Sequence, residues 1–302
     1  MPRFPDNARV VFIGDSLVAA NQTLWRIVDF YKTHFPNSGI RFFNCGISGG
    51  TAATALRFWE ENILIHKPTH AVIATGINDA RLSNLSLPRS KERLEALTAA
   101  YDEYRQNMTR LTELLLDAGV EVTLCTPAPY DEYGPHNTEA RPGGSALMAG
   151  YAGFVRLLAQ QKGLALCDYQ KYLTACIQTE EIFTADRVHP NPHGYYRIAC
   201  AFLAFQGLDA PEETALPEYL REWNDTVIIL RRLYGAEHML MKDPSMTEEE
   251  KIAFAARKTA AEDWGRPALE PFYRCYAAYK ARQPEIARRI CELYDRKVLK
   301  KE

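Results

Sequence analysis

Short apolar runs alternate with longer amphipathic stretches through the first two thirds of the chain. The apolar runs have the length of β-strands, and several are hydrophobic without interruption, as strands covered on both faces should be. They lie at residues 9–13, 40–44, 70–75, 120–126 and 163–167. Apolar residues recur at helical spacing over 21–34, 52–66, 90–118, 145–161 and 192–206. This rhythm of βα units predicts an α/β fold: a flavodoxin-like, doubly wound sheet of five parallel strands, with ligands beyond the carboxyl ends of the strands.

Beyond Gly207 the pattern becomes purely helical. The segment 208–216 is rich in acidic residues, and we interpret it as the junction between a core at residues 1–207 and an all-helical C-terminal extension at residues 208–302. Helical periodicity covers 216–233, 247–262, 268–281 and 284–300. Thr247 and Glu250 have the spacing of a capping box, which predicts a helix start. The extension could pack onto the core, cover the rim of a ligand site or form a homodimer contact, and the sequence does not choose.

Composition and charge narrow the class of protein. With 302 residues the chain exceeds the usual size of one domain, and 47% apolar residues are enough for a sizeable core. The formal net charge is -2, so no global field recruits nucleic acid or an anionic membrane surface. No run of about 18 apolar residues is present, which argues against a membrane span. We therefore expect a small neutral substrate and neither a nucleic-acid nor a membrane partner.

The compartment is predicted from the amino-terminal segment and the cysteines. The start of the sequence, MPRFPDNARVVFIGDS, lacks the apolar stretch and cleavage site of a secretory signal. The 7 cysteines are odd in number, scattered, and never spaced C-x-x-C. This usage is typical of reduced thiols, so we expect a cytoplasmic protein.

The first candidate for chemistry is Ser16, which follows the first predicted strand in the run Gly-Asp-Ser-Leu. A serine at a strand-to-helix turn lies beside the free backbone N–H groups of a helix N-terminus, which suit a nucleophile that needs an oxyanion donor. The alternative is a helix N-cap serine, which is a common reason for a serine at such a place.

Two further segments reach the same edge of the predicted sheet. The glycine-rich turn at 44–51 lets its backbone approach a ligand closely; it could instead cradle a phosphate, but it has neither P-loop nor dinucleotide spacing. Asn78 follows the third strand, and its amide can donate to an oxyanion without titrating. The alternative is that Asn78 and Asp79 form an Asx-turn that caps the next segment.

The last segment, DRVHPNPHG, holds Asp186 and His189 three residues apart. In a turn, this spacing lets the carboxylate hold one ring nitrogen of the histidine while the other faces the serine as a general base. His189 and His193 have the spacing of a helical metal pair, but Pro190 and Pro192 interrupt that helix. We expect no metal and no cofactor.

These four segments, in this order, resemble the SGNH hydrolases, also called GDSL esterases/lipases, over about residues 9–206. The resemblance implies Ser16 as nucleophile, Asp186 and His189 as acid and base, and an oxyanion hole made by Ser16, Gly49 and Asn78. Because the second block reads Ser-Gly-Gly, where many relatives have Ser-Gly-Asp, Gly50 is an alternative donor to Gly49. The helical extension has no counterpart in the minimal family fold.

The resemblance implies a serine esterase that works through an acyl-enzyme, with short acyl groups, acetyl above all, on a carbohydrate. A possible partner is therefore an acetylated oligosaccharide. Tyr130, Tyr133 and Tyr151 could stack on a sugar ring. The alternatives are a lysophospholipase or thioesterase, an acyltransferase that passes the acyl group to a sugar hydroxyl, and a noncatalytic binding module.

Overall fold

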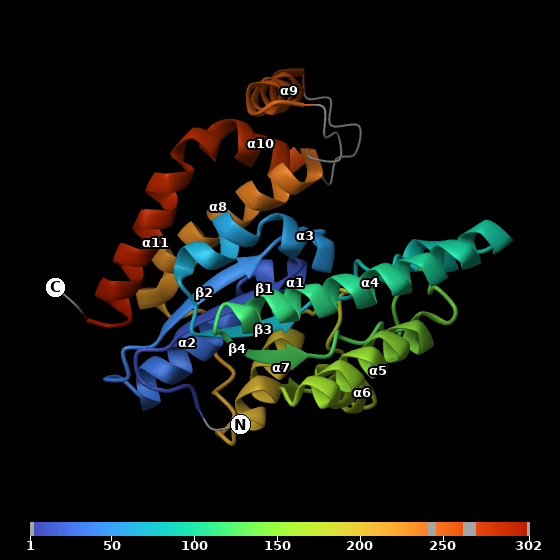
Figure 1. Cartoon of the computed structure of the whole chain (residues 1–302), viewed down its shortest axis with the longest axis horizontal. Coiled ribbons are helices and arrows are strands. Elements are labelled where there is room, and N and C mark those ends of the chain that lie inside the picture. Colours follow the sequence, from blue (N-terminus) through green and yellow to red (C-terminus); the bar gives the residue numbers. More distant parts are fainter. Residues whose placement is uncertain (1–2, 241–245, 262–269, 301–302) are drawn as a thin grey trace.

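The centre of the molecule is a five-stranded parallel sheet in the order β2-β1-β3-β4-β5 (Figure 1). We describe it from a computed structural model, in which residues 3–240, 246–261 and 270–300 are described. This order and the helices around the sheet confirm the predicted flavodoxin-like fold class. The strands are β1 (Arg9–Gly14), β2 (Arg41–Gly46), β3 (His70–Ala74), β4 (Glu121–Cys125) and β5 (Ala165–Cys167).

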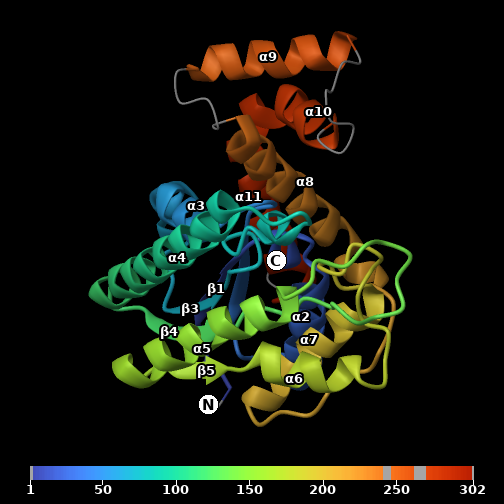
Figure 2. The same ribbon diagram turned by 90° about the vertical axis from the view of Figure 1, so that its right-hand side faces the viewer.

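Helices cover both faces of the sheet, as the uninterrupted apolar strands require (Figure 2). The direction of the side chains alternates along β1: Val10 and Phe12 belong to one buried cluster, and Val11 and Ile13 to another. The first cluster includes side chains of α2 (Gln22–His34), α6 (Tyr169–Ile177) and α7 (Pro192–Phe205). The second includes side chains of α3 (Ala52–Arg57), α4 (Lys91–Asp117) and α5 (Gly144–Lys162).

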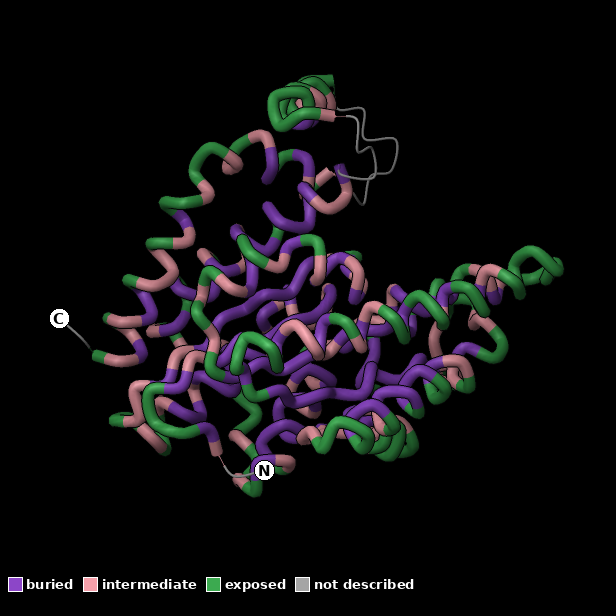
Figure 3. Tube along the Cα trace, in the orientation of Figure 1, coloured by how far each residue is buried: buried purple, intermediate pink, exposed green. Residues whose placement is uncertain are grey.

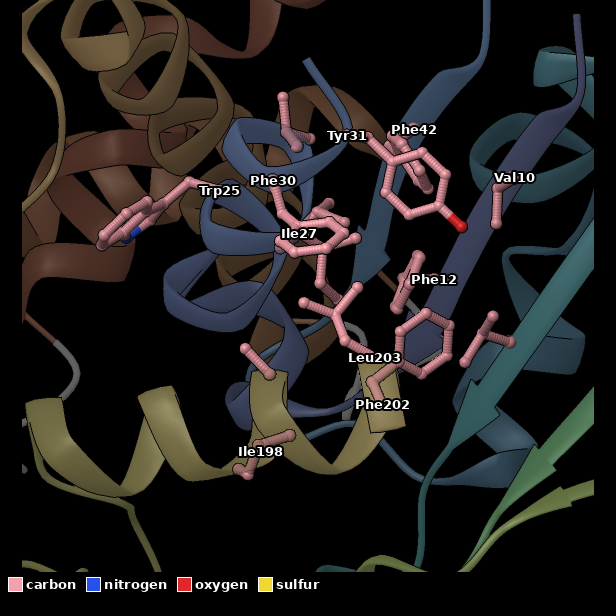
Figure 4. Packing of buried hydrophobic residues seen from close by; sticks show 14 of the residues in the cluster. Val10, Phe12, Trp25, Ile27, Phe30, Tyr31, Phe42, Ile198, Phe202 and Leu203 are labelled. Atoms are coloured by element: carbon pink, nitrogen blue, oxygen red, sulfur yellow. The ribbon is translucent and has the colours of Figure 1, made fainter. Parts of the chain in front are cut away.

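Aromatic side chains fill much of the α2–α7 side of the core. The ring centroids of Phe12 and Phe202 are 5.2 Å apart, which joins strand β1 to α7. Tyr31 and Phe42 meet edge to face at 5.0 Å and join α2 to β2 (Figure 4). The strands are buried along nearly their whole length (Figure 3), so the backbone at their carboxyl ends is held rigidly.

Two parts of the core differ from the predicted pattern. Helix α6 follows β5 where no helix was predicted; Asp168 caps it by accepting from Lys171 N. The predicted helix 52–66 is α3 followed by a π-helical turn (Trp59–Ile63) and a 3₁₀ turn (Leu64–His66). The widened turn buries Asn62, whose side-chain amide donates to Cys45 O at 2.9 Å. Apolar periodicity carries no signal for such a buried polar partner. A further 3₁₀ turn is formed by Leu82–Leu85.

The predicted helical extension is present. Thr247 and Glu250 form the predicted capping box, with Glu250 N donating to Thr247 Oγ1 and Thr247 N to Glu250 Oε2. Residue 262 and residues 268–269 of the predicted helices lie outside the described part of the chain. The extension consists of α8 (Glu218–Leu240), α9 (Glu248–Ala261), α10 (Glu270–Tyr279), a 3₁₀ turn (Lys280–Arg282) and α11 (Gln283–Lys297).

The extension packs along the outer edge of β2, where α8 and α11 lie beside the strand (Figure 1). Tyr294 Oη donates to the carbonyl of Ile40 at 3.2 Å, and Arg41 forms an ion pair with Asp295. Trp223 of α8 lies in the same buried cluster as β1 and β2. Packing onto the core is therefore one role of the extension, and it covers an edge that would otherwise be open. The domain boundary at residue 207 and the homodimer contact stay predictions.

Three features of the described residues bear on the sequence-based expectations. None of the helices in the described part of the chain is long and apolar enough to cross a membrane. The seven cysteines are all unpaired. Within residues 3–240, 246–261 and 270–300, no group of three or more metal-ligating side chains is arranged to hold an ion.

Candidate active site

Ser16 is the first residue of the short helix α1 (Ser16–Ala19), directly after β1. The N-cap of this helix is Asp15, whose carboxylate accepts from Leu17 N at 2.9 Å. The alternative reading of Ser16 as the capping residue is therefore wrong. Because Asp15 takes the capping role, the Ser16 hydroxyl is left to interact with groups from other parts of the chain.

The structure brings Ser16, His189 and Asp186 together. Ser16 Oγ lies 2.8 Å from His189 Nε2, although the two residues are 173 positions apart. His189 Nδ1 lies 2.6 Å from Asp186 Oδ2. A carboxylate at Nδ1 favours the tautomer with its proton on that nitrogen, which leaves Nε2 free to accept the serine proton.

The turn of residues 184–189, called here the His189 turn, fixes the Asp186 carboxylate. The carboxylate oxygen Oδ1, which does not face the His189 ring, accepts from Thr184 Oγ1 at 2.9 Å, Val188 N at 3.0 Å and His189 N at 2.8 Å. Partial burial alone raises the pKa of this carboxyl, but these hydrogen bonds and that from the His189 ring outweigh it and lower the pKa to about 2. Asp186 is therefore charged over the whole neutral range.

Arg187, inside the same turn, is a residue that the sequence analysis missed. Its guanidinium is buried and donates to carbonyl oxygens of residues 131, 132, 134, 136 and 138. Its own carbonyl accepts from Asp131 N at 3.0 Å. These bonds clamp the His189 turn to the loop after β4. An arginine in an otherwise polar motif gives no sign in the sequence that it is buried.

Residues 46–51, called here the Gly49 turn, follow β2 and lie beside Asn78. Gly50 N donates to Ile47 O at 2.9 Å, so this N–H is already used inside the turn. Gly49 has φ +73° and is exposed, and its N–H has no acceptor in the described part of the chain. This difference favours Gly49 over Gly50 as a donor to a ligand. Asn78 Nδ2 donates to Gly50 O at 2.9 Å, and its second hydrogen remains for another acceptor.

Asp79 supports the end of the Gly49 turn rather than the segment that follows it. Its carboxylate Oδ1 accepts from Ala52 N, the first residue of α3, at 3.0 Å. The other oxygen is buried without a partner among the described residues. Burial raises the pKa of Asp79 to about 7, and burial likewise raises that of the nearby Asp15 to about 6.

Two cavities open at these residues. The first, the Ser16 cavity, has a volume of about 440 Å³ and is lined by Ser16 and His189 together with residues of α8 and α10. The second, the Asn78 cavity, has a volume of about 620 Å³ and is lined by Gly49 and Asn78. A ligand bound across both would meet the hydroxyl, the imidazole and the N–H donors at once.

Comparison with known proteins decides the family. A model of the GDSL-like Lipase/Acylhydrolase family matches residues 12–197, which is well over half of the chain. The chain belongs to this family. The resemblance found in the motifs is thereby confirmed, and the activity of this GDSL-like hydrolase is that of a carboxylic ester hydrolase.

Relatives of this GDSL-like hydrolase include an acetylxylan esterase of Geobacillus stearothermophilus, 27% identical over 218 residues, which are 67% of this chain and 94% of that protein. The crystal structure of an acetylxylan esterase from the same organism matches with a TM-score of 0.58 and 25% identity, over 70% of this chain and 99% of the other. A gut microbial diltiazem-metabolizing enzyme matches with a TM-score of 0.60 and 24% identity over 68% of this chain, which spans only 48% of that structure. The last likeness concerns the fold alone.

The family match of this GDSL-like hydrolase ends before α8, yet α8 borders the site directly. Three α8 residues, about one turn apart, face the Gly49 turn. Arg231 donates to Gly46 O, and the ring nitrogen Nε2 of His238 lies 3.2 Å from Gly49 O. Between them, a Cβ atom at Gly235 would lie 3.4 Å from Ser48 Cβ and 3.1 Å from the Phe272 ring. Glycine at this position thus allows the helix to approach the turn closely.

Hydrogen bonds between three buried asparagine side chains also join α8 to the Gly49 turn. Asn21 Nδ2 donates to Asn224 Oδ1 at 3.0 Å, and Asn44 Nδ2 donates to Asn21 Oδ1 at 2.9 Å. Asn44 Oδ1 in turn accepts from Gly46 N at 2.9 Å. All three asparagines are buried, so each lost bond would leave an unsatisfied polar group. The extension therefore covers the rim of the site as well as packing on the core.

Other sequence-based candidates lie elsewhere. Tyr130 and Tyr151 cannot stack on a sugar, because both are buried in the core; of the three tyrosines only Tyr133 is exposed. His193 is the second residue of α7 and lies between Glu180 and Glu213. Pro192 begins α7 and keeps His189 outside the helix, as predicted.

Proposed function

We propose that Ser16, His189 and Asp186 form a catalytic triad that hydrolyses short acyl esters, acetyl esters in particular, carried by carbohydrates. The observation that carries this proposal is the pair of short contacts from Ser16 Oγ to His189 Nε2 and from His189 Nδ1 to Asp186 Oδ2. The acetylxylan esterase relative supports the acetyl and carbohydrate parts. A noncatalytic binding module does not fit an ester hydrolase of this family.

In the proposed reaction His189 takes the Ser16 proton while Ser16 Oγ attacks the ester carbonyl. The tetrahedral oxyanion accepts hydrogen bonds from Ser16 N, Gly49 N and Asn78 Nδ2. The imidazolium then gives its proton to the departing alcohol, and an acyl-enzyme remains. Water, deprotonated by the same histidine, attacks this intermediate and releases the acid.

The shape of the site supports a short acyl group. The Ser16 cavity is lined by polar as well as apolar side chains, including Gln22, Ser48 and Arg232. The apolar cavity beside Leu17 and Val18 has a volume of only about 40 Å³, far less than a fatty acyl chain needs. A lysophospholipase or a long-chain thioesterase would need a long apolar channel at the serine. A profile of p-nitrophenyl esters from acetyl to palmitoyl should therefore fall steeply with chain length.

The triad is tested with Ser16→Ala, which should lower kcat on p-nitrophenyl acetate by on the order of 10⁴-fold or more. Ser38→Ala is a matched control, because Ser38 precedes β2 at the opposite, amino-terminal edge of the sheet. A fluorophosphonate probe should label the wild type and Ser38→Ala but not Ser16→Ala. Full activity or labelling of purified Ser16→Ala would overturn the assignment. Acetate release from acetylated xylo-oligosaccharides tests the carbohydrate part separately.

Three further expectations concern the cellular location, the reaction products and the oligomeric state. We keep the expectation of a cytoplasmic location, which rests on the unpaired thiols. Product analysis with a sugar acceptor present separates hydrolysis from acyl transfer, because only a transferase forms a new sugar ester. A homodimer through the extension is tested by the mass of the protein in solution.

A further inference from the structure

The charged side chains that line the two cavities at the site are all basic. The Ser16 cavity has Arg231 and Arg232 in its wall, and the Asn78 cavity has Arg141 and Arg81, of which Arg81 is ion-paired with Glu103. No aspartate or glutamate is among the described residues that line either one. The whole chain has 36 basic and 38 acidic residues, so this imbalance is local and does not reflect composition.

Arg232 of α8 stands out among the basic residues of the extension. It is exposed, and in the described part of the chain it has no ion pair and no hydrogen bond from its side chain. Most other arginines of the extension are ion-paired with a glutamate. These are Arg221, Arg274, Arg282, Arg288, Arg289 and Arg296.

The neighbour of Arg232, Arg231, adds a second positive charge, which no carboxylate of the described residues balances through an ion pair. Its guanidinium is 3% exposed and donates to neutral acceptors, Asn62 Oδ1 at 2.7 Å and Gly46 O. Its buried Nε has no partner among the described residues. A cavity lined by one sign of charge and bounded by protein of low polarizability attracts ligands of the opposite charge.

We propose that Arg232 binds an anionic group of the substrate, so that the preferred ester is carried by an acidic sugar with a carboxylate, such as a uronic acid. This inference rests on the function proposed above and narrows its substrate class. It also replaces the expectation of a neutral substrate, which was drawn from net charge alone. A guanidinium pairs a carboxylate with two parallel hydrogen bonds, which fixes the orientation of the sugar as well as its affinity. Because the Ser16 hydroxyl lines the same cavity, the ester would be held close to the nucleophile.

The test uses two substrates that differ only at C6: an acetylated methyl glucuronide, which has a carboxylate there, and the methyl glucoside acetylated at the same positions, which has a hydroxymethyl group. For the wild type, kcat/KM for acetate release should be tenfold to a hundredfold higher on the glucuronide, the range for a hydrogen-bonded charged pair. Arg232→Gln should remove this preference, by lowering kcat/KM on the glucuronide much more than kcat/KM on the glucoside. Added salt should shrink the preference in the wild type only.

Two further variants test whether the preference depends on Arg232 itself. Arg221→Gln removes the same charge from the same helix, away from the cavity, and should keep the preference. Arg141→Gln removes a charge from the Asn78 cavity. If Arg141→Gln lost the preference for the glucuronide while Arg232→Gln kept it, the assignment to Arg232 would be overturned. Equal wild-type rates on both sugars would overturn the inference alone. If neither sugar released acetate while p-nitrophenyl acetate was hydrolysed, the carbohydrate part of the proposed function would fall, and the acidic-sugar substrate with it.

Discussion

The two turns that meet at Ser16 are held in different ways. The His189 turn is fixed within the α/β core, through Arg187 and the carbonyl oxygens of the loop after β4. The Gly49 turn is held partly by the C-terminal extension, through Arg231, Gly235 and His238 of α8. The family match covers the first set of contacts and ends before the second. The proposed acid-base half of the site is therefore built by the core, whereas the proposed oxyanion half also depends on helices beyond the core.

The largest expected effect lies in the His189 turn. Asp186→Asn should lower kcat on p-nitrophenyl acetate by about 10⁴-fold, because an amide at Nδ1 favours the wrong tautomer of His189. Asp102→Asn, an exposed substitution on α4, is the control and should leave kcat unchanged. Steady-state kinetics at neutral pH measures both. Near wild-type turnover by Asp186→Asn would mean that His189 acts without this carboxylate.

The next effect lies at the Gly49 turn. Asn78→Ala should lower kcat by about 10²- to 10³-fold, as expected for one lost oxyanion donor. The KM for a small ester should change little, because the oxyanion exists only in the transition state. The same kinetic assay separates the two parameters. A rise in KM with unchanged kcat would assign Asn78 to substrate binding instead.

A substitution in α8 tests directly whether the extension supports the Gly49 turn. Gly235→Val should push Ser48 and Phe272 away from α8 and move the Gly49 turn, which should lower kcat by roughly 10- to 100-fold. Gly150→Val in α5 is the matched control, because no atom lies within 4 Å of a Cβ added there. Thermal unfolding shows whether each variant remains folded. If folded Gly235→Val kept full activity, α8 would cover the Gly49 turn without fixing its position.

The last prediction concerns the stability of the fold and its dependence on pH. The folded-state pKa of Asp79 is about 7, above the value near 3.8 of a free carboxyl, so the folded protein binds this proton more tightly than the unfolded chain. The free energy of unfolding should therefore fall as pH rises from about 4 to about 7, by on the order of 3 kcal/mol from this group. Asp79→Asn should reduce the fall, as chemical denaturation at pH 5 and pH 8 would show. An identical pH dependence in both proteins would mean that Asp79 is charged in the folded state.

Local sequence patterns were sufficient to predict the fold class and the positions of most helices and strands. The positions of the five strands and the helix start after Thr247 follow from apolar periodicity and a cap, because a parallel sheet covered on both faces imposes long apolar runs. The break after Arg57 and the helix α6 were not predictable in this way. They depend on a buried amide and on an aspartate cap, which look like ordinary polar residues in a sequence.

For the site, the sequence by itself determined which groups are available: a serine after β1, a glycine turn after β2, an asparagine after β3, and an Asp-x-x-His turn before α7. Parallel strands end at one edge, so these segments had to converge there. Only the tertiary structure decided which N–H of the Gly49 turn is free, that Arg187 is buried, and that α8 reaches Gly46 and Gly49. The contacts of α8 join segments 185 and 189 residues apart, and those of Arg187 join segments 49 to 56 residues apart; local pattern carries no record of either.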